Sequence, residues 1–124
     1  MNCQRFCVNL TKKHYRLGLG LFALAILTAS SIPGKSLPSL IVLSPDKLLH
    51  MAEYSILGYL AFKSFESLSS IVVIGALIFA GLDEFWQSFI PGRFPSIYDV
   101  IADIIGFLLV AGTLYYRSRK MNDK

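Results

Sequence analysis

Four long apolar runs limit the folds that this sequence can form. They cover about Leu17–Ile32, Leu48–Phe62, Leu68–Ile90 and Ile97–Tyr116. A helix needs roughly 20 residues to cross the hydrocarbon core of a bilayer, and the third and fourth runs meet this length. The first and second runs are shorter, so they need a thinner bilayer, flanking residues that reach the interface, or neighbouring helices. The pattern predicts an all-α membrane protein in which four transmembrane helices form a compact bundle.

Composition and charge agree with this fold class. The 124-residue chain has room for one domain, and it is 54% hydrophobic but only 16% charged. Its mean hydropathy is +0.56, whereas soluble domains carry about 25% charged residues. The net charge of +4 comes from basic residues that flank the apolar runs and do not line one face. We therefore expect membrane lipid, and no nucleic acid, among the partners.

The placement of Lys and Arg predicts the orientation of the bundle. Nine basic residues fall in segments on the side of the N-terminus: Arg5, Lys12, Lys13, Arg16, Lys63, Arg117, Arg119, Lys120 and Lys124. Three fall on the other side: Lys35, Lys47 and Arg93. Basic loops stay in the cytoplasm, so both termini are predicted to be cytoplasmic. This gives a basic N-terminal segment at 1–16, a transmembrane domain at 17–116 and a basic tail at 117–124.

The first apolar run also allows an alternative. A basic region, a run of only 16 residues and the small residues Thr28, Ala29 and Ser30 resemble a cleavable signal peptide. Against this, the region before the run is long, and cleavage would leave three spans. We expect the first helix to be retained.

Polar residues interrupt the other three runs at places that this topology brings to one side, the outer membrane boundary. These residues are Asp46, His50, Glu53 and Tyr54 early in the second run, Asp83, Glu84 and Gln87 late in the third, Arg93 after the Pro91-Gly92 turn, and Asp99 and Asp103 early in the fourth. Ionisable residues within membrane segments are costly to bury, so they usually form a functional site or pair with one another. We therefore expect these groups to converge.

The predicted cluster has an excess of acid that some other group must balance. Six acids face Lys47 and Arg93, which gives −4 at this end of the bundle. Arg93 could pair with one or two carboxylates, or some acids could be neutral and hydrogen-bonded to Tyr54, Gln87 or Trp86. A divalent cation could also take carboxylate oxygens, with His50 as a further ligand. The sequence establishes no metal site, and the same residues could instead tie helices together, with Asp99 capping the helix that follows Ser96.

Acid–base chemistry at this cluster is one possibility, although the chain has no Gly-x-Ser-x-Gly or His-Glu-x-x-His motif. The candidate catalytic residues are Glu84, Asp83, His50 and Glu53. The candidates for binding a substrate or an anion are Arg93, Gln87, Tyr54, Asp99 and Asp103. The sequence does not decide whether the protein is an enzyme.

Two stretches, Asp46–Phe62 and Asp83–Gly106, resemble the VanZ-like family of small bacterial membrane proteins. The family pattern pairs Asp-Lys-x-x-His-x-x-x-Tyr with a later acidic-Glu-x-x-Gln segment, a Pro-Gly-Arg turn, an Asp, and an Asn or Asp before Gly. This chain has Asp103 where many members have Asn. The resemblance covers roughly residues 45–112, and it implies a four-helix domain in the bacterial cytoplasmic membrane.

The resemblance also implies a role in the cell envelope, because the name-giving member is linked to teicoplanin resistance. We expect the cluster to contact a lipid-linked or peptidoglycan precursor, or a glycopeptide target, near the outer leaflet. Two alternatives remain open. The protein could be a metal-assisted hydrolase or transferase that acts on a lipid-linked substrate, or a structural or accessory membrane protein.

Overall fold

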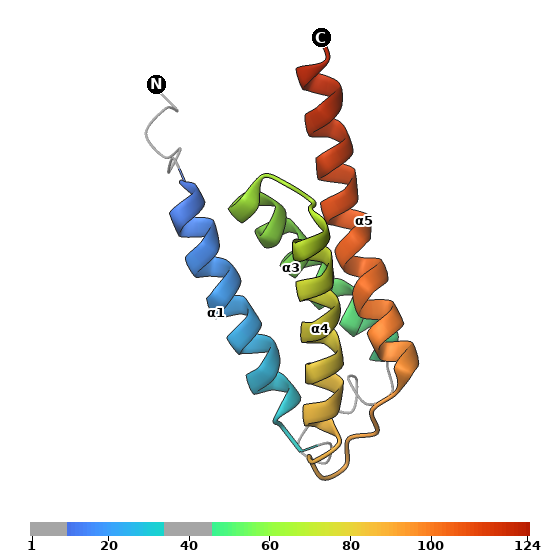
Figure 1. Cartoon of the computed structure of the whole chain (residues 1–124). Helices are drawn as coiled ribbons and strands as arrows, with labels where there is room; N and C mark the ends of the chain where they lie inside the picture. Colours follow the sequence, from blue (N-terminus) through green and yellow to red (C-terminus); the bar gives the residue numbers. More distant parts are fainter. Residues whose placement is uncertain (1–9, 34–45) are drawn as a thin grey trace, which may run out of the picture.

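The computed structural model describes residues 10–33 and 46–124, and these residues form four α-helices and no strand. The helices are α1 (Lys12–Ser30), α3 (Asp46–Phe65), α4 (Ser70–Gln87) and α5 (Ile97–Asn122). Successive helices run in opposite directions, so α1 and α4 end where α3 and α5 begin (Figure 1). We call this end of the bundle the site end, and we call the opposite end, where α1 begins and α5 finishes, the basic end. The all-α prediction is confirmed.

Helix boundaries follow the apolar runs, with shifts that local chemistry explains. α1 begins at Lys12, before its apolar run, because the backbone N–H of Thr11 donates to Nδ1 of His14 at 3.2 Å in a capping-box arrangement. α4 stops at Gln87, and turns follow through Gly92, which has φ of 77°. That left-handed backbone favours glycine. Arg5 and Lys35, which enter the orientation argument, lie outside the described residues.

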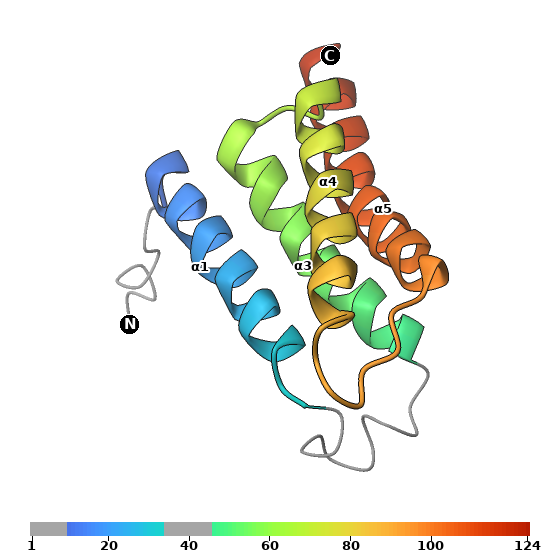
Figure 2. The same ribbon diagram turned by 60° about the horizontal axis from the view of Figure 1, so that its bottom comes forward.

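α3 crosses the bundle diagonally, from the start of α5 towards the start of α1 (Figure 1, Figure 2). Its closest neighbour is α5, because glycine stands on both sides of the contact. A Cβ on Gly58 would lie 2.6 Å from the carbonyl oxygen of Phe107, and a Cβ on Gly106 would overlap the carbonyl of Met51. Ser55 Oγ also donates to the Gly106 carbonyl at 3.2 Å. Small residues thus allow the two backbones to touch.

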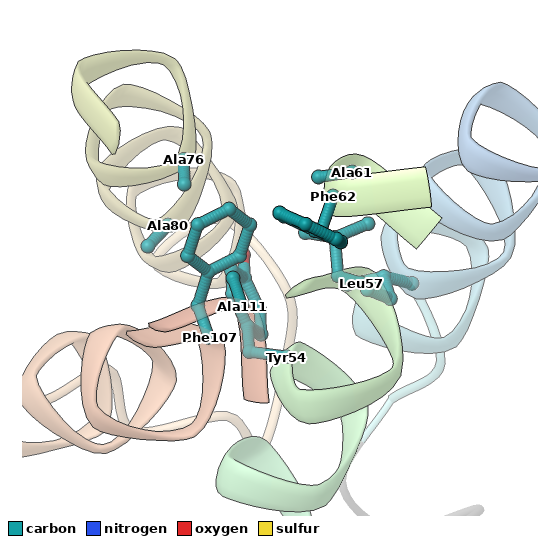
Figure 3. Close-up of a cluster of buried hydrophobic side chains, with 9 residues drawn as sticks. Tyr54, Leu57, Ala61, Phe62, Ala76, Ala80, Phe107 and Ala111 are labelled. Atoms are coloured by element: carbon teal, nitrogen blue, oxygen red, sulfur yellow. The ribbon is translucent and has the colours of Figure 1, made fainter. Parts of the chain in front are cut away.

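The apolar core lies beside this contact. Figure 3 shows Tyr54 of α3 and Phe107 of α5 facing the small residues Ala76 and Ala80 of α4. The ring of Tyr54 also packs against Phe79, with centroids 6.0 Å apart. Both alanines are buried, so the small residues of α4 form part of this core.

Within residues 10–33 and 46–124, only α4 and α5 are both long and apolar enough to cross a membrane by their own composition, with mean hydropathies of 1.4 and 1.9 in their most apolar windows. The prediction of four helices is thus confirmed, but the prediction that all four cross a membrane is not. α3 falls short because it carries the polar residues of the predicted cluster, and α1 because it begins with Lys12, Lys13 and Arg16. Large apolar side chains nevertheless lie exposed on all four helices, among them Leu17, Leu21, Leu24, Ile56, Ile71, Ile74, Ile78, Leu82, Ile101 and Leu109.

Candidate functional site

His50 is the centre of a buried polar cluster at the site end. Its Nδ1 lies 2.9 Å from Oδ1 of Asp103 on α5, and its Nε2 lies 3.7 Å from Oε1 of Glu84 on α4. The imidazole is 7% exposed, Glu84 is 6% exposed and Asp103 is fully buried. The two contacts span 53 and 34 residues of sequence, and three helices meet at one imidazole ring.

Two further carboxylates complete the cluster, one on each side of the ring. Single ligand atoms of His50, Asp83 and Asp103 all lie within 4.8 Å of one another, and the same holds for His50, Glu84 and Asp99. Lys47 Nζ lies 3.8 Å from Oδ1 of Asp99, but the lysine side chain is more than half exposed. The structure therefore brings His50, Asp83, Glu84, Asp99 and Asp103 together, as the topology predicted.

Many oxygen atoms in this cluster receive no hydrogen bond from the described part of the chain. The buried atoms without a partner are both carboxylate oxygens of Asp83, Oε1 of Glu84, Oδ1 of Asp99, Oδ2 of Asp103 and the hydroxyl of Tyr54. Buried polar atoms normally have partners, and a cluster of four carboxylates around one imidazole carries more negative charge than one His can balance. Bound protons, a cation or a polar ligand must therefore supply the difference.

The start of α5 is capped in a way that the sequence did not indicate. Ser96 Oγ accepts from the backbone N–H of Tyr98 at 3.2 Å, while the backbone N–H of Ser96 donates to Oε2 of Glu84 at 3.0 Å. The acidic half of the capping box was predicted for Asp99, but Glu84 of the neighbouring helix takes that place. Asp99 faces the cluster as a result.

Arg93 has a different partner from the carboxylates that the sequence suggested. Its Nη2 donates to the carbonyl oxygen of Ala29 at 2.8 Å, and its Nε donates to that of Ile32 at 3.0 Å. Among the described residues, no carboxylate lies within ion-pair distance of its guanidinium. The last carbonyl groups of a helix have no partners within the helix, so a cation at this end is favourable. Arg93 thus fastens the end of α1 to the turn after α4.

Two side chains of α4 also form hydrogen bonds with serines at the end of α1. Gln87 Nε2 donates to Oγ of Ser30 at 3.2 Å, and Trp86 Nε1 donates to Oγ of Ser31 at 2.8 Å. Ser30 and Ser31 were not predicted as hydrogen-bond partners of α4, because serine is common at helix ends. Their position at the end of a predicted antiparallel helix was the available signal.

Glu53 and Tyr54 lie one turn after His50 on α3 and differ in exposure. Tyr54 is fully buried between the cluster and the apolar core, and Glu53 is half-buried at the edge. The side chain of Asp46 lies outside the described part of the chain.

A groove of about 530 Å³ opens beside the cluster, between the end of α4 and the start of α5. Its polar lining comes from Glu84, Ser88 and Ser96, and the rest is apolar, with Leu77, Phe85, Ile97 and Val100 among the lining residues. Glu84 therefore belongs both to the buried cluster and to the lining of this groove.

Of three comparisons with known proteins, one gives a match. Searches of curated proteins and of solved structures found no match. A family model, VanZ/LLP1, matches residues 9–118, which include all four helices to within a few residues and every residue of the cluster. The chain belongs to the VanZ/LLP1 family.

Proposed function

We propose that this VanZ/LLP1 protein is an integral protein of the bacterial cytoplasmic membrane that serves the cell envelope. In this proposal all four helices cross the bilayer and the site end faces outward. The buried cluster of one imidazole and four carboxylates then binds the polar part of a lipid-linked or peptidoglycan precursor near the outer leaflet. Resistance to glycopeptides such as teicoplanin is one form that this role could take.

The exterior of the bundle supports the membrane placement. Contiguous apolar surface larger than a few hundred Å² is rare on soluble monomers, whereas apolar side chains are exposed here along all four helices. Antiparallel helices also suit a bundle that crosses the membrane repeatedly, because each helix satisfies its own backbone groups.

The two ends of the bundle differ in charge, which supports the proposed orientation. Among the described residues, the basic end carries Lys12, Lys13, Arg16, Lys63, Arg117, Arg119, Lys120 and Lys124. The site end carries Lys47 and Arg93, and Arg93 is engaged with the carbonyl groups of α1. Such an asymmetry favours a cytoplasmic basic end.

The observation that carries the envelope role is the buried cluster itself. Buried carboxylates without donors are unfavourable for folding, so their presence beside an open groove favours a binding site over a device for stability. The groove is largely apolar next to the carboxylate of Glu84. That combination suits an amphiphilic ligand, whose lipid part stays in the bilayer.

A second candidate function is hydrolysis or group transfer on such a lipid-linked substrate. The observation in its favour is the position of His50, whose Nδ1 is held by Asp103 while its Nε2 faces Glu84 at the side of the groove. An imidazole oriented in this way is a suitable general base.

Site-directed labelling tests the orientation. In a background with Cys3 and Cys7 replaced by serine, one variant carries Ser88→Cys at the site end and another carries Lys124→Cys at the basic end. We expect a membrane-impermeant maleimide to label Ser88→Cys in intact spheroplasts, and Lys124→Cys only after lysis. Labelling of Lys124→Cys in intact spheroplasts would contradict the proposed topology.

Complementation tests the envelope role. A strain without its own copy receives wild type, Glu84→Gln or Glu66→Gln, and teicoplanin susceptibility and the pool of lipid-linked precursors are measured. Glu66 is a matched control because it lies at the basic end, exposed and 3.0 Å from Lys12. We expect Glu84→Gln to behave like the empty strain and Glu66→Gln like wild type. Identical readouts for the empty and the complemented strain would refute the envelope role.

A further inference from the structure

We infer that His50, Glu84 and Asp99 form a binding site for one divalent transition-metal ion, with Asp103 as the positioning residue behind the histidine. This inference goes beyond the proposed function, because a cation can bind here whichever envelope partner the protein has. Four features of the cluster carry it: two distances, the partners of the histidine, the orphaned oxygen atoms, and the access from the groove.

One of the two distances at the imidazole is a hydrogen-bond distance, and the other is longer. Nδ1 of His50 lies 2.9 Å from Asp103, which is a hydrogen-bond distance, while Nε2 lies 3.7 Å from Glu84, which is too long for one. Two ligands that are each about 2.1 Å from a tetrahedral metal ion lie about 3.4 Å apart. The gap between Nε2 and Oε1 is thus near the separation that a shared metal ion requires. The geometry places the ion on the Nε2 side of the ring.

Asp103 gives the histidine the tautomer that a metal ligand needs. A carboxylate that accepts the Nδ1–H of a histidine leaves the lone pair on Nε2, and this carboxylate–histidine arrangement is common behind metal ligands. Asp103 is fully buried on α5, and the glycine contact between α3 and α5 lies one turn away at Gly106. The ring is therefore held in place by packed backbone.

The two carboxylate ligands have free oxygen atoms of the right kind. Oε1 of Glu84 and Oδ1 of Asp99 are buried atoms without a hydrogen-bond donor among the described residues, and each residue is 6% exposed. Oε2 of Glu84 accepts from the backbone of Ser96, which fixes the other oxygen towards the ring. Two carboxylates and a neutral imidazole balance the charge of one divalent cation. The exposed Lys47 near Asp99 would compete with it weakly.

Access and ligand type indicate the class of metal. Three protein ligands leave a fourth position open, as in catalytic sites, and Glu84 lines the groove of about 530 Å³. An imidazole nitrogen with two carboxylates suits Zn²⁺ or Mn²⁺, whereas Mg²⁺ and Ca²⁺ prefer oxygen ligands alone. We therefore expect Zn²⁺ and Mn²⁺ to bind more tightly than Mg²⁺ or Ca²⁺.

Titration of the full-length protein tests the site. The protein is purified in mild detergent, stripped with a chelator and titrated with Zn²⁺, Mn²⁺, Mg²⁺ and Ca²⁺ by calorimetry. We expect one equivalent of Zn²⁺ to bind, with X-ray absorption showing a single imidazole and oxygen ligands. Absence of stoichiometric binding of Zn²⁺ and Mn²⁺ to wild type would overturn the inference, and it would leave the envelope role to be judged by complementation alone.

Variants decide which carboxylates hold the ion. We expect His50→Gln, Glu84→Gln and Asp99→Asn to weaken Zn²⁺ binding at least tenfold, and Asp103→Asn to weaken it about 10- to 100-fold. The exposed control Glu66→Gln should bind like wild type, and Asp83→Asn should weaken Zn²⁺ binding less than Asp99→Asn does. If Asp83→Asn abolished binding and Asp99→Asn did not, the ion would belong to the opposite side of the ring, and our assignment would be wrong. The X-ray absorption of wild type decides the imidazole ligand if a variant fails to fold.

Discussion

Replacing Gly106 by alanine should destabilise the bundle, although the same change elsewhere in a helix is favourable. The Cβ of the new residue would overlap the carbonyl group of Met51, which is backbone and cannot rotate away. α3 and α5 must therefore separate locally. Since Asp103 lies one turn before Gly106, this movement should also lengthen its hydrogen bond to His50.

The size of the effect follows from three contributions. Alanine in place of glycine favours a helix by up to about 1 kcal/mol. Overpacking at a close contact costs about 1–3 kcal/mol, and loss of the bond from Ser55 to the Gly106 carbonyl costs about 1 kcal/mol. We therefore expect Gly106→Ala to lower the free energy of unfolding by about 1–3 kcal/mol.

Gly112 on the same helix provides the matched control. A Cβ there would meet no atom within 4 Å, so Gly112→Ala should be neutral or stabilising by up to about 1 kcal/mol. Unfolding of both variants and wild type in a denaturing detergent titration gives the comparison. If Gly106→Ala proved as stable as Gly112→Ala, the close approach of α3 and α5 would be wrong.

Three further substitutions test individual contacts. Arg93→Met should lower stability by about 1–2 kcal/mol through loss of its bonds to the α1 carbonyl groups, with Arg117→Met as control; equal melting temperatures for the two would contradict that role. Trp86→Phe should lose about 1 kcal/mol with its bond to Ser31, and chemical unfolding that matches wild type would argue against the bond. Asp83→Asn should raise the melting temperature in the presence of a chelator, because it removes an unpaired buried charge. A clear fall would mean that this carboxylate has a charged partner.

The helices and the convergence of the cluster could be predicted from the sequence because both follow from long-range pattern. Alternating directions of four apolar runs are enough to bring His50, Glu84 and Asp103 to one end. The spacing of polar residues along each helix then places them on the face that points into the bundle. Hydrophobic periodicity and topology need no knowledge of individual contacts, and for this reason they succeeded.

Individual partners could not be predicted, because several groups of the same chemistry compete for each side chain. Arg93 could have paired with any of several carboxylates, but the free carbonyl groups at the end of α1 lie nearer. Ser96 could have been capped by Asp99 of its own helix, but Glu84 supplies the acceptor. Gly58 carried no pattern of its own, because its role depends on which residue of α5 faces it.

Mean hydropathy does not record the direction in which the polar residues of a helix face. α3 and α1 do not reach the apolarity of a span, although the exposed side chains of α3 include Leu48, Ile56 and Phe65. An average over a helix cannot distinguish a buried carboxylate from one that faces lipid. The number of spans therefore stays a proposal, and the labelling experiment tests whether the two ends of the bundle lie on opposite sides of the membrane.

One measurement tests most directly whether the cluster is a site or only a structural network. The melting temperatures of wild type and Glu84→Gln are compared in detergent with a chelator and again with Zn²⁺. Glutamine preserves an acceptor for the Ser96 N–H and removes the charge. We expect Glu84→Gln to melt at or above wild type in the chelator, and wild type to melt higher once Zn²⁺ is present. If Glu84→Gln melted well below wild type in the chelator, the carboxylate would be a structural partner, and the cluster would serve the fold.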